Sequence, residues 1–191
     1  MGEGLEYGTL EVAGVRRGYW LARGPDAAGP LLVVLHGSGT SGKDMATTFS
    51  GLAGRGPAAG VTTVFPDGWR GVWHIARPPA GEPGLDDAAF LRALVGELGG
   101  APVFLAGISN GGGFAEHVAR HGLLPLAGLF LAAGTYREFS RQAQLVPRQR
   151  TAVAIMSGTG DRGPGGELPR RAAARAGRGG LDPAAAGRPA R

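Results

Sequence analysis

The sequence of 191 residues contains no cysteine, few aromatic residues and no long apolar run. Without cysteine, a disulfide framework and a thiolate metal site are excluded. No stretch approaches the roughly 18 consecutive apolar residues that a membrane-spanning helix needs, so we predict no contact with a membrane. The first residues also lack a basic stretch followed by an apolar one, which is the pattern of a secretory signal. We therefore expect a cytoplasmic protein.

Hydrophobic residues make up 43% of the chain and charged residues 18%, which is enough to build a core. A chain of this length has room for one domain of ordinary size. The net charge is +5, but residues 162–191 hold seven arginines against Glu167 and Asp182. Residues 1–161 therefore balance to zero, and the basic character belongs to the C-terminal segment alone.

The segment 162–191 differs in composition from the rest of the chain. Arg, Ala, Gly and Pro fill 26 of its 30 positions, and it holds no aromatic or β-branched residue. Such a composition cannot bury enough apolar surface to fold. We predict a folded domain over 1–161 and a disordered tail over 162–191. Nucleic-acid binding is not favoured, because no aromatic side chain is present for base stacking. A coding sequence read in another frame past Asp161 is an alternative origin for the tail.

Hydrophobic periodicity predicts strands that alternate with helices. Residues 7–22 alternate around Gly14 and predict a β-hairpin. Continuous apolar runs, typical of strands covered on both faces, occupy 31–35, 61–65, 103–106, 126–132 and 152–156. Helical spacing occupies 44–53, 86–98 and 109–121. This order predicts an α/β fold with a mostly parallel sheet between two layers of helices, a three-layer αβα sandwich.

A Gly-x-Ser-x-Gly pattern follows one of the predicted strands and opens a predicted helix. It spans Gly107 to Gly111, with Ser109 at its centre. Nucleophilic catalysis needs a serine on a sharp strand-to-helix turn, and the two glycines let such a turn pack closely. Backbone N–H groups at the helix N-terminus would then face the developing oxyanion. We predict Ser109 as a nucleophile. The alternative is a glycine-rich turn in which Ser109 only caps the helix.

The loop after the strand 31–35 has two interpretations. Its sequence His36-Gly37-Ser38-Gly39 suits an oxyanion loop, in which the backbone N–H of Ser38 is a donor. The same residues also resemble a phosphate loop, because Gly37 to Lys43 make G-x-x-x-x-G-K. Asp44 stands where that motif needs Ser or Thr for magnesium. A nucleotide-binding domain using Gly37–Lys43 therefore remains an alternative.

A catalytic acid is predicted at Asp161, which follows the last predicted strand and gives the chain order Ser…Asp of the α/β-hydrolases. That order requires a histidine after Asp161, and the last histidine is His121. His117 and His121 lie about 12 and 18 Å along the helix from Ser109. His74 lies in a loop that could approach the cleft and is the candidate base.

Five motifs in order resemble a known family. They are LLVVLHGSG (31–39), FPDG (65–68), DDAAFLRAL (86–94), VFLAGISNGGGF (103–114) and GTGD (158–161). Together they are similar to the polyhydroxybutyrate depolymerase and feruloyl-esterase-like branch of the α/β-hydrolases, over residues 7–161. The resemblance implies a serine esterase with Ser109 as nucleophile, Asp161 as acid and oxyanion donors at Ser38 and Asn110. Members continue with further strand, helix and a histidine-bearing segment, so we expect a domain truncated at its C-terminal end.

The sequence therefore predicts hydrolysis of a small or polymeric carboxylic ester, such as a hydroxyalkanoate, feruloyl or acetyl ester, through an acyl-enzyme. We expect no cofactor and no metal. Because no histidine follows Asp161, the activity is expected to be impaired. A non-catalytic remnant of the fold is the other alternative, and the oligomeric state stays open.

Overall fold

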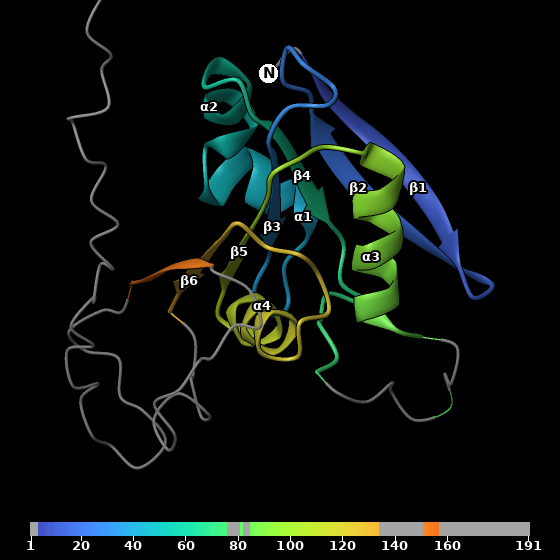
Figure 1. Ribbon diagram of the computed structural model, residues 1–191. Helices are drawn as coiled ribbons and strands as arrows, with labels where there is room; N and C mark the ends of the chain where they lie inside the picture. The colour runs from blue at the N-terminus through green and yellow to red at the C-terminus, as the bar shows by residue number, and fades with distance from the viewer. Residues whose placement is uncertain (1–3, 76–80, 82–84, 134–150, 157–191) are drawn as a thin grey trace, which may run out of the picture.

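The computed structural model describes residues 4–75, 81, 85–133 and 151–156 (Figure 1). The tail predicted over 162–191 and the acid predicted at Asp161 lie outside the described residues. The described residues form seven strands: β1 (Leu5–Val12), β2 (Val15–Ala22), β3 (Leu31–Leu35), β4 (Thr62–Pro66), β5 (Val103–Ile108), β6 (Gly128–Ala132) and β7 (Ala152–Met156). The helical segments among these residues are α1 (Gly42–Asp44), the π-helical turn η1 (Met45–Phe49), α2 (Leu52–Ala58), α3 (Asp87–Leu98) and α4 (Asn110–Arg120).

The strands form one sheet in the order β1-β2-β4-β3-β5-β6-β7. The first two strands are antiparallel, with β1 paired to β2 and β2 to β4, and the pairs from β4 through β7 are all parallel. The hairpin turn places Ala13 and Gly14 at positive φ, 51° and 78°, which suits the right-handed twist of the strands. The predicted hairpin and the mostly parallel sheet are confirmed.

Two layers of helices cover the sheet, as the alternating pattern predicts. One core joins α3 and α4 to the sheet and contains Phe90, Leu94 and Phe114, each 0–1% exposed, against Leu31 and Leu35. The second core lies on the other face, where Met45 and Ala46 pack against Val34 and Phe65. Figure 1 shows α3 and α4 in front of the strands, with α1 and α2 behind them. The three-layer αβα sandwich is confirmed.

Two predictions about individual elements are wrong. The helix predicted over 44–53 is three short segments, because Gly51 adopts a left-handed conformation (φ 63°) that ends η1 and begins α2. The apolar run 152–156 forms β7, but its five residues are exposed instead of covered on both faces. Among the described residues, β7 pairs only with β6. A strand whose apolar sequence is typical of a buried strand therefore lies at the edge of the sheet.

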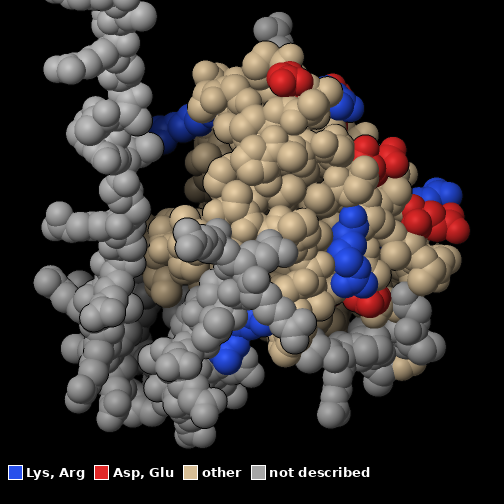
Figure 2. All heavy atoms as spheres, in the orientation of Figure 1, with Lys and Arg blue, Asp and Glu red and all other residues tan. Residues whose placement is uncertain are grey.

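Charged side chains of both signs lie near one another on the face shown in Figure 2, most of them on the right of the view. The rest of the described surface on this face is largely uncharged. This agrees with the zero net charge of residues 1–161. In the part of the chain that the structure describes, no helix has the length and apolar character to cross a membrane.

Candidate active site

Ser109 lies at the junction of β5 and α4, with an exposed side chain. Its backbone angles are φ 53° and ψ −119°, a conformation that L-residues rarely adopt. It occupies the N-cap position of α4, but its hydroxyl makes no capping hydrogen bond. The strained strand-to-helix turn predicted here is therefore present, and the interpretation of Ser109 as a helix cap is not supported.

The two outer glycines of the motif are required by close backbone packing. A Cβ added at Gly107 would collide with the carbonyl of Gly111 and would lie 2.8 Å from the nitrogen of Gly112. A Cβ added at Gly111 would collide with the carbonyl of His36 and would lie 2.7 Å from that of Leu35. The first turn of α4 thus sits directly on the end of β3, and this contact brings Ser109 beside the loop that follows β3.

The loop after β3 presents an unused N–H group beside Ser109. A Cβ added at Gly37 would lie 3.5 Å from the Cβ of Ser109. In this loop, the N–H of Gly39 donates to the carbonyl of Gly71 (2.9 Å) and the N–H of Thr40 to that of Gly37 (3.4 Å). Among the described residues, the N–H of Ser38 has no acceptor. Ser38 itself is exposed, so a bound ligand can reach it.

His36 has a structural role, because both of its ring nitrogens are occupied. Nδ1 donates to the carbonyl of Gly37 (2.7 Å), and Nε2 accepts from the N–H of Gly68 (2.8 Å). The side chain is fully buried, and burial lowers the pKa of His36 below its ordinary value of 6.5. A neutral imidazole with both nitrogens bonded holds the loop after β3 to the loop after β4, and it has no free nitrogen to act as a base.

Asp67 also joins these two loops. Its Oδ1 accepts from the N–H of Gly42 at 2.7 Å, and burial raises the pKa of Asp67 above its ordinary value of 3.8. The carboxyl is therefore bonded to the start of α1, 25 residues away along the chain.

The segment after β4 is fastened to the first turn of α4. The side chain of Asn110 accepts from the N–H of Trp73 (2.8 Å) and donates to the carbonyl of the same residue (3.1 Å). The Trp73 indole stacks on Phe114 with ring centroids 5.4 Å apart, and its N–H donates to the carbonyl of His36 (3.1 Å). Asn110 therefore has a role for its side chain that the sequence does not predict, beside the predicted role for its backbone N–H.

The candidate base His74 is paired with a buried carboxylate. Its Nδ1 lies 3.3 Å from Oδ2 of Asp87, and its backbone N–H donates to the same oxygen at 2.7 Å. The other oxygen, Oδ1, accepts from Nη2 of Arg17 at 2.6 Å. The Asp87 side chain is 0% exposed, that of Arg17 3% and that of His74 23%. Only the histidine of this group reaches the surface.

The residues of the suspected phosphate loop have structural reasons to be present. A Cβ at Gly42 would collide with the carbonyl of Phe65, so this glycine is required for α1 to pack on β4. The ammonium group of Lys43 lies 5.2 Å from the Trp20 ring centroid, and Asp44 forms a capping box with Ser41. The helix that follows this loop, α1, has three residues. These contacts favour the hydrolase interpretation over the nucleotide one.

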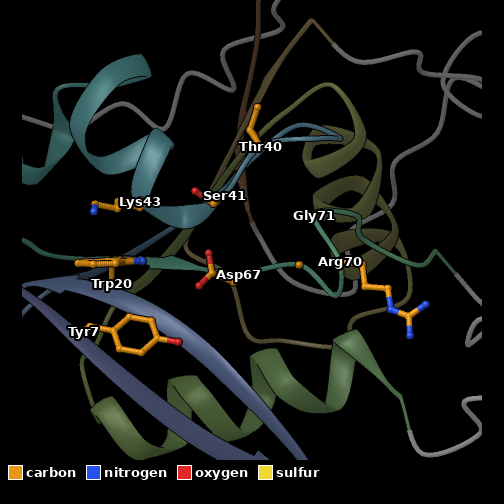
Figure 3. Close-up of a pocket in the computed structure, with 9 residues that line it drawn as sticks. Tyr7, Trp20, Thr40, Ser41, Lys43, Asp67, Arg70 and Gly71 are labelled. Atoms are coloured by element: carbon orange, nitrogen blue, oxygen red, sulfur yellow. The ribbon is translucent and has the colours of Figure 1, made fainter.

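An open pocket of about 510 Å³ adjoins the loop after β3. Figure 3 shows Lys43 and Tyr7 on opposite sides of the Trp20 ring, with the Asp67 carboxylate beside them. Thr40 and Gly71 form the wall nearest the loop, and a Cβ at Gly71 would lie 3.7 Å from Cα of Gly39. The pocket wall therefore contacts the loop after β3 next to Ser38, although Ser38 itself does not line the pocket.

Two functional candidates are missed by the sequence, Arg17 and Asp87. In the sequence, Asp87 is only the second residue of the helix predicted over 86–98. The sequence does indicate that one residue of the pair Asp86-Asp87 has another role, because one carboxylate is enough to cap a helix. Asp86 provides that cap, by accepting from the N–H of Ala89 at 2.9 Å, and leaves Asp87 for another role.

No protein-family model matches this chain, and neither does any curated protein sequence. Solved structures do resemble it. S-formylglutathione hydrolase FrmB from Staphylococcus aureus matches 70% of this chain and 58% of its own, with 12% identity and a TM-score of 0.55. FphF, a fluorophosphonate-binding serine hydrolase of Staphylococcus aureus, matches 76% of this chain and 64% of its own, with 13% identity and a TM-score of 0.54. A ferulic acid esterase matches 68% and 59%, with 18% identity and a TM-score of 0.51.

The chain thus spans less than two thirds of the length of each of these proteins. At this level of identity, the similarity concerns the arrangement of strands and helices. The sheet order, the parallel pairs from β4 to β7 and the helix that begins after Ser109 all belong to that arrangement. The described part of this chain has the α/β-hydrolase fold.

Proposed function

We propose that this protein is a serine hydrolase that cleaves carboxylic esters, with Ser109 as the nucleophile. The observation that carries the proposal is the conformation of Ser109, an exposed serine with strained backbone (φ 53°) whose hydroxyl is not used to cap α4. Strain of this kind costs about 1–3 kcal/mol and is concentrated at functional sites. A serine that only ended a strand would not need it.

The carbonyl oxygen of the ester would lie between the loop after β3 and the first turn of α4. The N–H of Ser38 has no acceptor among the described residues, and the first N–H groups of any helix, here beginning with Asn110, lack intrahelical acceptors. Two such donors stabilise the negative charge that develops on the oxygen. The closeness of Gly37 to Ser109 supports this arrangement.

The reaction would proceed in two steps. Ser109 Oγ attacks the carbonyl carbon while its proton passes to a base, and the ester C–O bond breaks as the alcohol leaves with a proton from that base. Water then cleaves the acyl-enzyme, releasing the acid and restoring the hydroxyl of Ser109. The candidate base is His74. Asp161 stays a prediction as the acid, since it lies outside the described residues.

The choice of ester is a finer part of the proposal. The five motifs resemble polyhydroxybutyrate depolymerases and feruloyl esterases, and a ferulic acid esterase is among the similar structures. Hydroxyalkanoate and feruloyl esters are therefore the first substrates to test. The pocket lined by Tyr7, Trp20 and Asp67 would hold the part of the molecule attached to the carbonyl.

The proposal is tested by measuring turnover of p-nitrophenyl acetate and p-nitrophenyl butyrate by purified protein and by Ser109→Ala. We expect hydrolysis by the wild type that is lost in Ser109→Ala. Ser50→Ala is a matched control, because Ser50 is a second serine just before a helix, outside the pocket, and its hydroxyl accepts from the N–H of Leu52 in α2 (3.2 Å); we expect it to keep the wild-type turnover. Equal turnover by the wild type and Ser109→Ala, or none by either, would contradict the proposal and favour a non-catalytic remnant.

A further inference from the structure

We propose that Asp87 is a positioning residue that orients His74 as the base for Ser109. This inference rests on the proposed function and adds the source of the base and its acid partner. The sequence predicts Asp161 for this part, and Asp87 is the alternative that lies within the described residues.

Asp87 has the contacts of a carboxylate that fixes a histidine ring. Both of its oxygens are used: Oδ1 accepts from Arg17 at 2.6 Å, and Oδ2 faces the N–H and Nδ1 of His74 at 2.7 and 3.3 Å. The side chain is fully buried. An ionised carboxylate only accepts hydrogen bonds, so Nδ1 of His74 must carry the proton. Nε2 is then the nitrogen with a lone pair, which is the form that a general base needs.

His74 is held beside the turn that Ser109 begins. The residue before it, Trp73, makes two backbone hydrogen bonds to the side chain of Asn110. The residue after it, Ile75, has its Cδ1 3.2 Å from the position of a Cβ at Gly113, and the N–H of Gly113 donates to the carbonyl of Ser109. Both neighbours of His74 therefore contact the first turn of α4, so the segment that carries the half-buried imidazole is fastened to that turn.

The other histidines of the chain are less suited to this role. His36 has both ring nitrogens bonded and is fully buried. His117 and His121 lie further along α4, with their rings 4.4 Å apart, and a helix rises about 1.5 Å per residue away from Ser109. His74 combines partial exposure, a buried acid partner and a backbone segment fastened to the first turn of α4.

Arg17 makes this pair different from an isolated histidine–carboxylate pair. Its guanidinium is itself buried, donates to Asp87 and to the carbonyl of Asp67, and lies 4.3 Å from the Phe90 ring centroid. Arg17 thus occupies one oxygen of Asp87 and leaves the other to His74. We therefore expect Asp87 to act mainly by fixing the tautomer and direction of the ring.

The first test measures the rate at which a fluorophosphonate reacts with Ser109. In this reaction Ser109 Oγ bonds to phosphorus, the P–F bond breaks, fluoride leaves and the serine proton passes to Nε2 of His74. We compare the wild type, His74→Ala, Asp87→Asn and the double variant. A general base contributes about 10²–10⁴-fold, so we expect His74→Ala to react at least about 100-fold more slowly. Asp87→Asn should slow the wild type but not slow His74→Ala any further.

Asp86→Ser is the matched control, because it removes the neighbouring charge and keeps a side-chain oxygen to cap α3. We expect it to react at the wild-type rate. Equal slowing by Asp87→Asn in the presence and absence of His74 would overturn the inference, since Asp87 would then act through the fold. If Ser109 of the wild type does not react at all, the proposed function itself is contradicted. This result differs from equal slowing by Asp87→Asn, which contradicts only the role of Asp87.

A second test does not depend on the Asp87 variant being folded. Nitrogen-15 spectra of the wild type report which ring nitrogen of neutral His74 carries the proton, and we expect Nδ1. Imidazole added to His74→Ala should restore the reaction of Ser109, because a free imidazole can replace a missing base but not a missing structural contact. A proton on Nε2, or no rescue by imidazole in a folded variant, would overturn the inference.

Discussion

Replacing Ser109 by glycine should stabilise the protein, although it removes the proposed nucleophile. Ser109 has φ 53° and ψ −119°, a region in which side chains strain the backbone by about 1–3 kcal/mol. Glycine adopts such angles without this strain. The increase in the free energy of unfolding is reduced by about 0.4–1 kcal/mol, because glycine also makes the unfolded chain more flexible. The net expectation is a rise of about 1 kcal/mol in the free energy of unfolding.

Ser109→Ala separates this effect from loss of the hydroxyl, because alanine keeps the Cβ and hence the strain. The comparison is thermal unfolding of the two variants at equal concentration, followed by far-UV circular dichroism. For a chain of this size, 1 kcal/mol corresponds to about 2–4 °C in Tm. We expect the glycine variant to unfold at the higher temperature by this amount. A glycine variant that unfolds at or below the temperature of Ser109→Ala would refute the assignment of strain to this position.

Three further predictions concern the packing around the site. Gly111→Ala should lower the free energy of unfolding, measured in urea, by about 1–3 kcal/mol, because the added Cβ would collide with the carbonyl of His36. Gly96→Ala is the control: a Cβ at Gly96 meets open space in the middle of α3, so this variant should be as stable as the wild type or more stable. Phe90→Ala should cost about 3–5 kcal/mol in the same assay, since the ring is fully buried; a loss below about 1 kcal/mol would contradict this. Burial lowers the pKa of His36 below 6.5, so His36 binds a proton more readily in the unfolded chain than in the folded one. The free energy of unfolding should therefore fall as the pH drops below 6.5. In His36→Gln this part of the pH dependence should disappear, and an unchanged pH dependence would contradict the prediction.

The sequence predicts most of the sheet, because buried parallel strands have continuous apolar sequences. The run at 31–35 coincides with β3, and that at 152–156 with β7. The same signal gives a wrong environment for β7, since composition does not report which strand lies at an edge. The helix predicted over 44–53 fails because the left-handed conformation of Gly51 interrupts a pattern that apolar spacing alone continues.

The geometry around Ser109 follows from local sequence, whereas the partners of His74 do not. Gly107 is required by atoms of Gly111 and Gly112, close in the chain, and Gly111 by the carbonyl groups at the end of the neighbouring strand β3; both glycines belong to the motif, so the motif itself predicts the turn. Asp87 is paired with Arg17, which is 70 residues away on β2. A contact of that kind depends on the order of strands in the sheet, and a helical pattern cannot report it. The predicted role of Asp161 stays a prediction.

The most direct test of the central claim is to identify the residue that a fluorophosphonate modifies. The protein is incubated with the probe, digested and sequenced by tandem mass spectrometry, with Ser109→Ala as the control. The proposed mechanism predicts one modified peptide, with the phosphonyl group on Ser109, and no modification of the Ser109→Ala variant. Modification of another serine such as Ser38 or Ser41, or an unmodified wild-type protein, would contradict the assignment of Ser109 as the nucleophile.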